Sequence, residues 1–326
     1  MSARRFATID VGTNTVLLLV AERRGDALVP VAERAEITRL GRGVDATGRL
    51  DRAAIRDTVA VLVAYAREAR ALGVEGIACV ATSAARDAAN GGDFFAAARD
   101  EAGLAPEVIP GDEEARLVYV TAWRDFGPDA AAVHPQRSSR GAPAESNGPG
   151  PLAVLDVGGG STEFIVGEGP APRARVSLQV GAVRVTERHV RAHPIAPAEL
   201  AAMREDARRT FAALADLRTA PGARLVGVAG TVTTLSAVAQ ALPRYDGEKV
   251  HGARLTLAEI EALVERMARL PVAERAALPG MEPKRADVIV GGGVVVAEAM
   301  RAAGFSALTV SDRGVRWGLL YDRFPS

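Results

Sequence analysis

The feature that most constrains how this chain can fold is a pattern that occurs twice. In each copy an apolar segment ends in Asp-Val-Gly, a short polar turn follows, and a second apolar segment comes after it; the copies span residues 6–20 and 152–166. Because strand-like residues follow both turns, each copy predicts a β-hairpin rather than a strand that leads into a helix. The chain therefore contains an internal duplication.

Length and composition are those of a globular protein with two domains. The 326 residues are 48% hydrophobic and 25% charged, which is enough to bury a sizeable core. Lysine plus arginine and aspartate plus glutamate number 40 each, so no net field draws the molecule to nucleic acid or to a membrane. We expect neither as a partner, and any affinity for a polyanion must be local.

The single cysteine and the start of the chain favour a cytoplasmic location. Cys79 lies in an apolar run that is typical of a buried strand, and a lone cysteine excludes a disulfide framework. The first residues lead directly into a strand-like segment, without the apolar core and cleavage site of a signal peptide. No apolar stretch is long enough to span a bilayer. We therefore expect a cytoplasmic protein.

Strand-like and helical segments alternate along the chain, which indicates an α/β architecture. Residues 53–72 place apolar side chains at helical spacing, and residues 256–270 begin with Thr256 and Glu259 at the spacing of a capping box. Other segments are predicted as strands (224–229, 307–311) or helices (235–242, 288–303, 314–321). Residues 127–151 contain many helix breakers and little to bury, so we predict a flexible insertion there.

The two turns have the composition of a phosphate-binding site. Glycines let a ligand approach the backbone closely, while amide N–H groups and short hydroxyls converge on an anion. The residues concerned are Gly12, Thr13, Asn14 and Thr15 in the first turn and Gly158, Gly159, Gly160, Ser161 and Thr162 in the second. One glycine-rich turn is often only structural, whereas two that face each other would clamp a phosphate. Their spacing fits neither the Walker motif nor the dinucleotide-binding motif.

An aspartate precedes each turn, Asp10 in the first copy and Asp156 in the second. A carboxylate beside bound phosphate is explained mainly as a direct or water-mediated ligand of Mg²⁺. The pair of turns resembles the phosphate hairpins of the superfamily of acetate and sugar kinases, heat-shock ATPases and actin. Two further glycine turns, at 229–234 and 291–293, suit a third and a fourth wall of such a cleft, or are simple connections.

A third acidic segment distinguishes a phosphatase from a kinase. Residues 109–117 read Ile-Pro-Gly-Asp-Glu-Glu-Ala-Arg-Leu, so adjacent carboxylates open a helix that leads to Tyr119 and Trp123. Carboxylates at a helix start are often mere partners of the helix dipole. Upstream, however, residues 81–90 contain Arg86, whose planar guanidinium suits phosphate oxygens. The combination is more informative than either segment alone.

These motifs, in this order, resemble those of the exopolyphosphatase and guanosine pentaphosphate phosphatase family. They are Ile-Asp-Val-Gly-Thr-Asn-Thr (9–15), Ala-Thr-Ser-Ala-Ala-Arg-Asp-Ala (81–88), Gly-Asp-Glu-Glu-Ala-Arg-Leu (111–117) and Asp-Val-Gly-Gly-Gly-Ser-Thr-Glu (156–163). Shorter matches continue at 179–184, 229–231, 278–281, 285–287 and 310–314. The resemblance covers essentially the whole chain, and we expect the short two-domain form of the family.

The resemblance implies roles for individual residues. Glu114 would orient and deprotonate the attacking water, with Glu113 the neighbouring alternative, and Arg86 would act at the phosphoryl group. The implied ligands of Mg²⁺, with Mn²⁺ the alternative metal, are Asp10, Asp156 and Glu163. The two turns would hold the phosphoryl oxygens together with Ser83, Arg86, Gly230 and Thr231. Candidates for binding a longer polyanion are Arg184, Lys249, His251, Lys284, Arg285 and Arg313.

The resemblance also implies the fold. We expect a two-domain actin-like ATPase fold with an interdomain cleft, each domain being ribonuclease-H-like. The first domain would comprise residues 1–125, joined by the C-terminal helix 314–326; residues 126–150 would be the insertion and residues 151–313 the second domain. By the same resemblance we expect a homodimer.

The expected activity is hydrolysis of the terminal phosphoanhydride of inorganic polyphosphate, with release of orthophosphate. Removal of the γ-phosphate of guanosine pentaphosphate is the close alternative, because one constellation could hydrolyse both. Two other classes stay open. An actin-like ATPase or kinase would need an adenosine pocket and an acceptor site, and a polyphosphate or alarmone sensor would bind without turnover.

Overall fold

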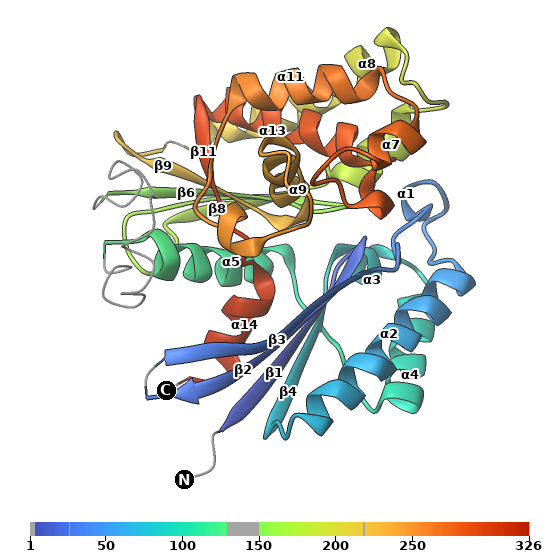
Figure 1. Ribbon diagram of the computed structural model, residues 1–326, viewed down its shortest axis with the longest axis vertical. Coiled ribbons are helices and arrows are strands. Elements are labelled where there is room, and N and C mark those ends of the chain that lie inside the picture. The colour runs from blue at the N-terminus through green and yellow to red at the C-terminus, as the bar shows by residue number, and fades with distance from the viewer. Residues whose placement is uncertain (1–3, 26, 129–149, 218, 326) are drawn as a thin grey trace. The chain divides into compact units, whose positions relative to one another are not determined.

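The computed structural model describes residues 4–25, 27–128, 150–217 and 219–325, and the chain divides into two compact units (Figure 1). The first unit is Met1–Leu117 with Val315–Ser326, and the second is Val118–Gly314. The predicted insertion lies almost entirely outside the described residues. The domain limits expected from the sequence remain predictions, and the division into units does not test them.

The first unit contains a five-stranded sheet in the order β3-β2-β1-β4-β5. Its strands are β1 (Arg5–Val11), β2 (Thr15–Arg24), β3 (Ala27–Ile37), β4 (Gly76–Ala81) and β5 (Glu107–Val108). β1, β2 and β3 are antiparallel neighbours, whereas β4 runs parallel to both β1 and β5. The first predicted hairpin is thus confirmed. The sequence pattern did not reveal β3, because this edge strand is mostly exposed and shows no apolar alternation.

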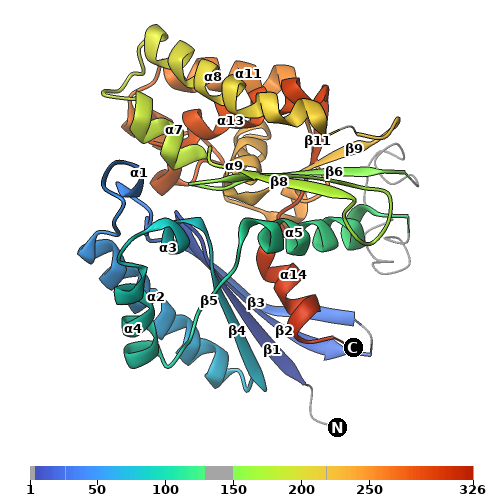
Figure 2. The ribbon, with the colours of Figure 1, turned by 180° about the vertical axis from the view of Figure 1, so that it is seen from behind.

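Helices cover both faces of this sheet. The helices of the first unit are α1 (Val44–Thr47), α2 (Arg52–Ala71), α3 (Ser83–Asp87), α4 (Gly91–Ala102), the first part of α5 (Gly111–Phe126) and α14 (Val315–Arg323), of which α2 and α4 cover one face and α14 the other. Side chains alternate between the faces: Ile9 and Leu18 pack in the core under α2 and α4, while Phe6 and Leu19 pack with Trp317 of α14. α14 therefore lies on the face opposite α2 (Figure 2).

The second unit contains a six-stranded sheet in the order β10-β11-β9-β6-β7-β8. Its strands are β6 (Leu152–Val157), β7 (Thr162–Gly167), β8 (Ala174–Leu178), β9 (Arg224–Val228), β10 (Arg254–Thr256) and β11 (Ala307–Val310). β6 and β7 form the second predicted hairpin, and β6, β9 and β11 run parallel. The carboxyl ends of these three strands therefore share one edge of the sheet.

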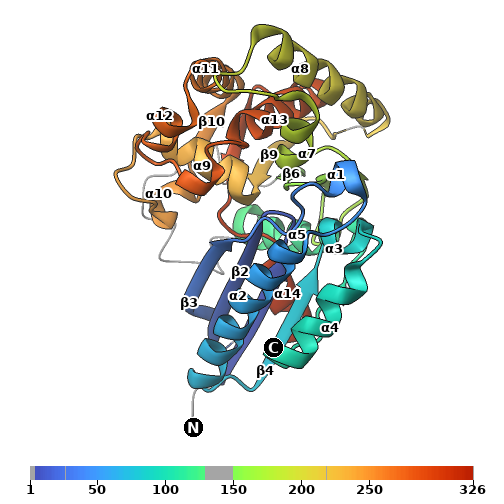
Figure 3. The ribbon, with the colours of Figure 1, turned by 90° about the vertical axis from the view of Figure 1, so that its right-hand side faces the viewer.

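One face of the second sheet is covered by a helical layer (Figure 3). The helical elements of the second unit are α7 (Ala182–His189), α8 (Pro197–Phe211), η2 (Ala212–Asp216), α9 (Ala229–Ala239), α10 (Gly247–Val250), α11 (Leu257–Ala268), α12 (Val272–Ala276), η3 (Pro283–Arg285) and α13 (Ile289–Ala303). The predicted capping box of α11 is present, since Thr256 and Glu259 exchange hydrogen bonds. On the other face the second half of α5 packs on β7, where a Cβ at Gly167 would lie 2.2 Å from the Tyr119 hydroxyl.

The structure corrects the prediction of turns at residues 229–234 and 291–293. The first segment opens α9, and the second lies inside α13, in agreement with the helix predicted for residues 288–303. The glycines of α13 serve close helix packing instead: a Cβ at Gly291 would lie 2.3 Å from the Thr186 hydroxyl on α7, and one at Gly293 would lie 2.6 Å from Val264 on α11. Glycine runs that look like turns in sequence can thus mark helix contacts.

Among the residues that the structure describes, no helix is both long enough and apolar enough to cross a membrane.

Candidate active site

The two hairpin turns have the same local geometry. The Gly12 amide donates to the Thr15 carbonyl at 3.0 Å, and the Gly158 amide donates to the Ser161 carbonyl at 3.0 Å. A Cβ on either glycine would lie 3.1 Å from the same carbonyl oxygen, so both turns favour glycine at this point. Each turn follows a strand that ends in Asp-Val, which confirms the duplication at the level of hydrogen bonds.

Neighbouring backbone holds the first turn in place. The amides of residues 38 and 39 both donate to the Asn14 carbonyl at 3.1 Å, and the Gly41 amide donates to the Thr13 carbonyl at 2.8 Å. The Thr13 hydroxyl forms a hydrogen bond with the Ser83 hydroxyl at 2.8 Å. Ser83 begins α3, directly after the strand that pairs with β1. Thr13 and Ser83, both predicted phosphate ligands, therefore lie together.

Helix α7 holds the second turn in an equivalent way. The carbonyls of Gly158 and Gly159 accept hydrogen bonds from the first amides of α7 at 3.0 and 2.9 Å. The Gly160 carbonyl accepts from Arg184 Nε at 2.8 Å. A Cβ at Gly181 would lie 2.5 Å from the Gly159 carbonyl oxygen, so α7 can approach this turn only because Gly181 has no side chain.

The carbonyl contacts orient the N–H groups of both turns. In a trans peptide the N–H points away from the C=O of the same plane. Because the carbonyls are directed to neighbouring segments, the N–H groups of the following residues point to the opposite side. These residues are Asn14 and Thr15 in the first turn and Gly159, Gly160 and Ser161 in the second. Several N–H groups on one side of a turn suit an anion.

The helix start at Gly111 separates the two candidate bases. Glu113 accepts two hydrogen bonds from Arg116, at 2.8 and 2.7 Å, so its carboxylate is engaged with its own helix. Glu114 is 8% exposed, and its Oε2 lies 3.9 Å from Nη1 of Arg86. The same Arg86 nitrogen donates to the Ile109 carbonyl at 3.2 Å, which ties α3 to the segment before α5. The two glutamates therefore have different surroundings.

The second hairpin carries a pair of buried carboxylates. Asp156 and Glu163 are paired across β6 and β7 and are 6% and 1% exposed. The Ser177 hydroxyl donates to Glu163 Oε1 at 2.7 Å. Burial raises the pKa of Asp156 to about 7, because a charge without water is unfavourable. Asp10, at the matching position of the first hairpin, is 8% exposed.

Buried carboxylates of this kind fit a divalent cation chemically. A nearby cation would favour the ionised form of Asp156, and Mg²⁺ in phosphate sites takes only one or two carboxylates with substrate oxygens and water. No group of three His, Cys, Asp or Glu side chains arranged to hold a metal occurs among the described residues.

The segment after β9 is held by a partly buried arginine, Arg285. Ala229 has a positive φ of 71° at the start of α9. The Gly230 carbonyl accepts from Arg285 Nη1 at 2.6 Å, and the same nitrogen donates to the Thr234 hydroxyl at 3.0 Å. A Cβ at Gly230 would lie 2.2 Å from the Arg285 guanidinium carbon. Sequence reasoning assigned Arg285 only to a polyanion surface and missed this contact with the turn, for which spacing gives no signal.

The other basic candidates differ in accessibility. Arg313 is 6% exposed and pairs with Asp125 at 2.7 Å, and Nδ1 of His251 lies 2.8 Å from Oδ1 of Asp312. Lys249, in contrast, is an exposed side chain on α10. Arg313 thus lies in the interior of the second unit, whereas the Lys249 side chain is exposed to solvent.

The predicted site residues fall into two groups, one on each unit. The first unit holds Asp10, Gly12, Thr13, Asn14, Thr15, Ser83, Arg86, Glu113 and Glu114. The second unit holds Asp156, Gly158, Gly159, Gly160, Ser161, Thr162, Glu163, Gly230 and Thr231. Within each unit these residues lie at or next to the carboxyl ends of parallel strands, where ligands of open α/β sheets bind.

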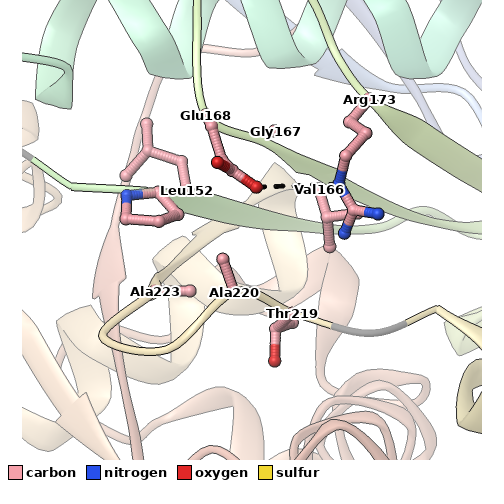
Figure 4. Close-up of a pocket in the computed structure, with 9 residues that line it drawn as sticks. Leu152, Val166, Gly167, Glu168, Arg173, Thr219, Ala220 and Ala223 are labelled. Carbon is pink, nitrogen blue, oxygen red and sulfur yellow. Dashed lines mark ion pairs between the residues drawn. The ribbon is translucent and has the colours of Figure 1, made fainter.

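A shallow pocket lies elsewhere on the second unit (Figure 4). Its lining includes Leu152 at the start of β6 and Gly167 at the end of β7, with Glu168 and Arg173 at its rim 3.9 Å apart. This is the sheet edge opposite Asp156, and the lining contains none of the predicted site residues.

The fold defines the class of the protein first. Each unit contains a mixed sheet with a hairpin whose first strand ends in Asp-Val, and solved structures of the Ppx/GppA family confirm the predicted two-domain α/β fold. The Aquifex aeolicus member of the Ppx/GppA family is 32% identical with a TM-score of 0.75, covering 99% of this chain and 98% of that chain. An exopolyphosphatase-like protein of 30% identity has a TM-score of 0.85 at the same coverage.

Sequence comparison then gives the family. The model of the Ppx/GppA phosphatase family matches residues 19–134 and 138–326, and the chain belongs to this family. Exopolyphosphatase 2 of Mycobacterium tuberculosis is 39% identical over 336 residues, which cover 98% of each chain. The predicted enzyme class, a hydrolase of phosphoanhydride bonds, is thereby confirmed.

Proposed function

We propose that this chain is an exopolyphosphatase, which releases orthophosphate from the end of inorganic polyphosphate by metal-assisted attack of water. The observation that carries the proposal is the match, over 98% of each chain, to a protein named exopolyphosphatase 2. The two glycine turns support it, because a polyanion without a base or sugar offers only phosphate oxygens to recognise. Removal of the γ-phosphate of guanosine pentaphosphate is the alternative, since the same phosphate contacts would serve it.

In this proposal the two turns hold the terminal phosphoryl group. N–H groups on one side of each turn and the hydroxyls of Thr13, Ser83 and Ser161 would donate hydrogen bonds to its oxygens. Mg²⁺, with Mn²⁺ as the alternative, would be held by Asp10, Asp156 and Glu163 and would neutralise the charge of the phosphate chain. Arg86 would add a charge-assisted donor to the phosphoryl oxygens.

Glu114 is the proposed general base. Its burial favours a proton-accepting role in a water-poor site, and phosphoryl transfer needs an aligned nucleophile more than covalent chemistry. Glu113 is less suited, because its carboxylate binds Arg116 with both oxygens. The different surroundings of the two glutamates thus favour Glu114.

The experiment is phosphate release from long-chain polyphosphate and from guanosine pentaphosphate, each with Mg²⁺ or with a chelator. Glu114→Gln is expected to lower kcat at least about a hundredfold, and Glu113→Gln, its matched neighbour, far less. The ratio of the two wild-type rates identifies the substrate. Wild-type protein that binds polyphosphate but releases no phosphate from either compound would instead identify a sensor.

A further inference from the structure

An ion-pair network joins the start of α5 to the closing helix within the first unit. Arg116 Nε and Nη2 donate to the two oxygens of Glu113, and Arg116 Nη2 also donates to Asp322 Oδ1 at 2.5 Å. Asp322 lies on α14, 206 residues further along the chain. Arg116 therefore fastens the first turns of α5, which carry Glu114, to α14.

Helix α14 is itself fixed on the sheet. Trp317 and Leu320 pack with Phe6 and Leu19 in one apolar cluster, and the Thr8 hydroxyl donates to the Arg316 carbonyl at 2.8 Å. Trp317 and Leu320 are almost completely buried. Apolar packing and this hydrogen bond thus hold the helix on the sheet in addition to its ion pairs.

The backbones of α5 and α14 also lie in close contact. A Cβ at Gly318 would lie 2.1 Å from the Leu117 carbonyl oxygen, so α5 touches α14 where a glycine removes the side chain. Arg116 directly precedes Leu117, and its hydrogen bond to Asp322 is a second link between the two helices. On its other side, the segment before α5 is held by Arg86 through the Ile109 carbonyl.

We propose that Asp322 is a positioning residue for hydrolysis, which acts through Arg116 and Glu113 to hold the turn that carries Glu114. The inference rests on the proposed role of Glu114 as general base. In the proposed role Asp322 does not touch the substrate. It orients the Arg116 guanidinium, which donates to both Glu113 and Asp322. A base that is misplaced by a fraction of an ångström loses rate while substrate binding is unchanged.

A positioning role and a purely structural role of Asp322 lead to different measurable results. Arg116 and Asp322 are 33% and 23% exposed, and an ion pair that is partly solvated contributes little to global stability. A structural role would therefore lower the melting temperature and the activity together or change neither. A positioning role lowers kcat alone.

The test compares Asp322→Asn with wild type, using polyphosphate and Mg²⁺. We expect kcat to fall about three- to tenfold with KM and melting temperature unchanged, and Asp322→Glu to recover part of the loss. Glu75→Gln is the matched control, because this carboxylate also pairs with an arginine of the first unit, Arg4, at 2.9 Å. It should leave kcat unchanged.

A double-mutant cycle sharpens the result. If Asp322 acts through Arg116, Asp322→Asn should have no further effect on kcat in an Arg116→Gln background. Unchanged kcat in Asp322→Asn, an effect on KM alone, or full additivity in the cycle would overturn the inference. Failure of the proposed function is distinguishable, since the wild type would then release no phosphate under the same conditions.

Discussion

Asp156 and Glu163 lie opposite each other in the β6–β7 hairpin, whereas the matching pair in the β1–β2 hairpin is Asp10 and Leu17. The duplication thus preserves the turns and the first carboxylate but not the second. Both residues of the acidic pair are buried, so two carboxylates share one water-poor location. This asymmetry predicts that the second hairpin contributes more to cation binding than the first.

We expect Glu163→Gln to raise the Mg²⁺ concentration for half-maximal phosphate release by about tenfold or more, because the variant keeps the shape of the side chain but loses its charge. A titration of initial rate against Mg²⁺ measures this. Glu168→Gln is the control, since Glu168 is exposed just beyond the same strand. Superimposable titrations for Glu163→Gln and wild type would exclude Glu163 from the cation site.

The raised pKa of Asp156 makes the stability of the metal-free protein depend on pH. Its folded pKa of about 7 exceeds the ordinary 3.8, so between these values the folded state binds more protons than the unfolded state. Stability is therefore expected to fall as pH rises from about 4 to about 7 and to be independent of this group outside that window. Denaturant unfolding across this range, in chelator, measures the slope.

The Asp156→Asn variant identifies the group that causes this slope. An asparagine cannot ionise, so its unfolding free energy should fall less steeply than that of wild type over the same pH range. Equal slopes for the two proteins would assign the pH dependence to other groups.

Gly181→Ala should damage the second turn. The added Cβ would lie 2.5 Å from the Gly159 carbonyl oxygen, a backbone atom that cannot rotate away. Overpacking of this kind costs about 1–3 kcal/mol, and displacement of the turn should also raise KM for polyphosphate. Gly92→Ala, where a Cβ meets nothing within 4 Å, is the control. Normal stability and KM in Gly181→Ala would show that α7 can move aside at no cost.

Arg275 should be required for the stability of the second unit. It is 0% exposed and donates to the carbonyls of Met267, Leu270 and Ala286 at 3.0, 3.0 and 2.6 Å. Arg275→Leu would leave these buried acceptors without their donor, at a cost of roughly 3 kcal/mol or more. Chemical denaturation measures it, with the exposed Arg269→Leu as the control. A variant as stable as wild type would contradict this role.

Local patterns predicted most of the regular structure. Apolar spacing identified α2 to within one residue at each end, and Asp51 caps it by accepting from the Ala53 and Ala54 amides. Both hairpins followed from apolar runs around a polar turn, since strand and turn preferences act over a few residues. β3 was not predicted, because its mostly exposed side chains show no alternation of apolar and polar residues. α9 begins earlier than predicted, because Gly230 suggested a turn.

The sequence by itself determined the duplication, the aspartate before each turn, the acidic start of α5 and the family, because these depend on residues that are adjacent in the chain. Only the tertiary structure distinguished Glu113 from Glu114, showed which helices Gly291 and Gly293 contact, and brought Asp322 to Arg116 and Arg285 to Gly230. The physical reason is that burial, hydrogen-bond partners and close backbone approach arise between segments that lie far apart in the sequence. The spacing of residues along the chain therefore does not predict them.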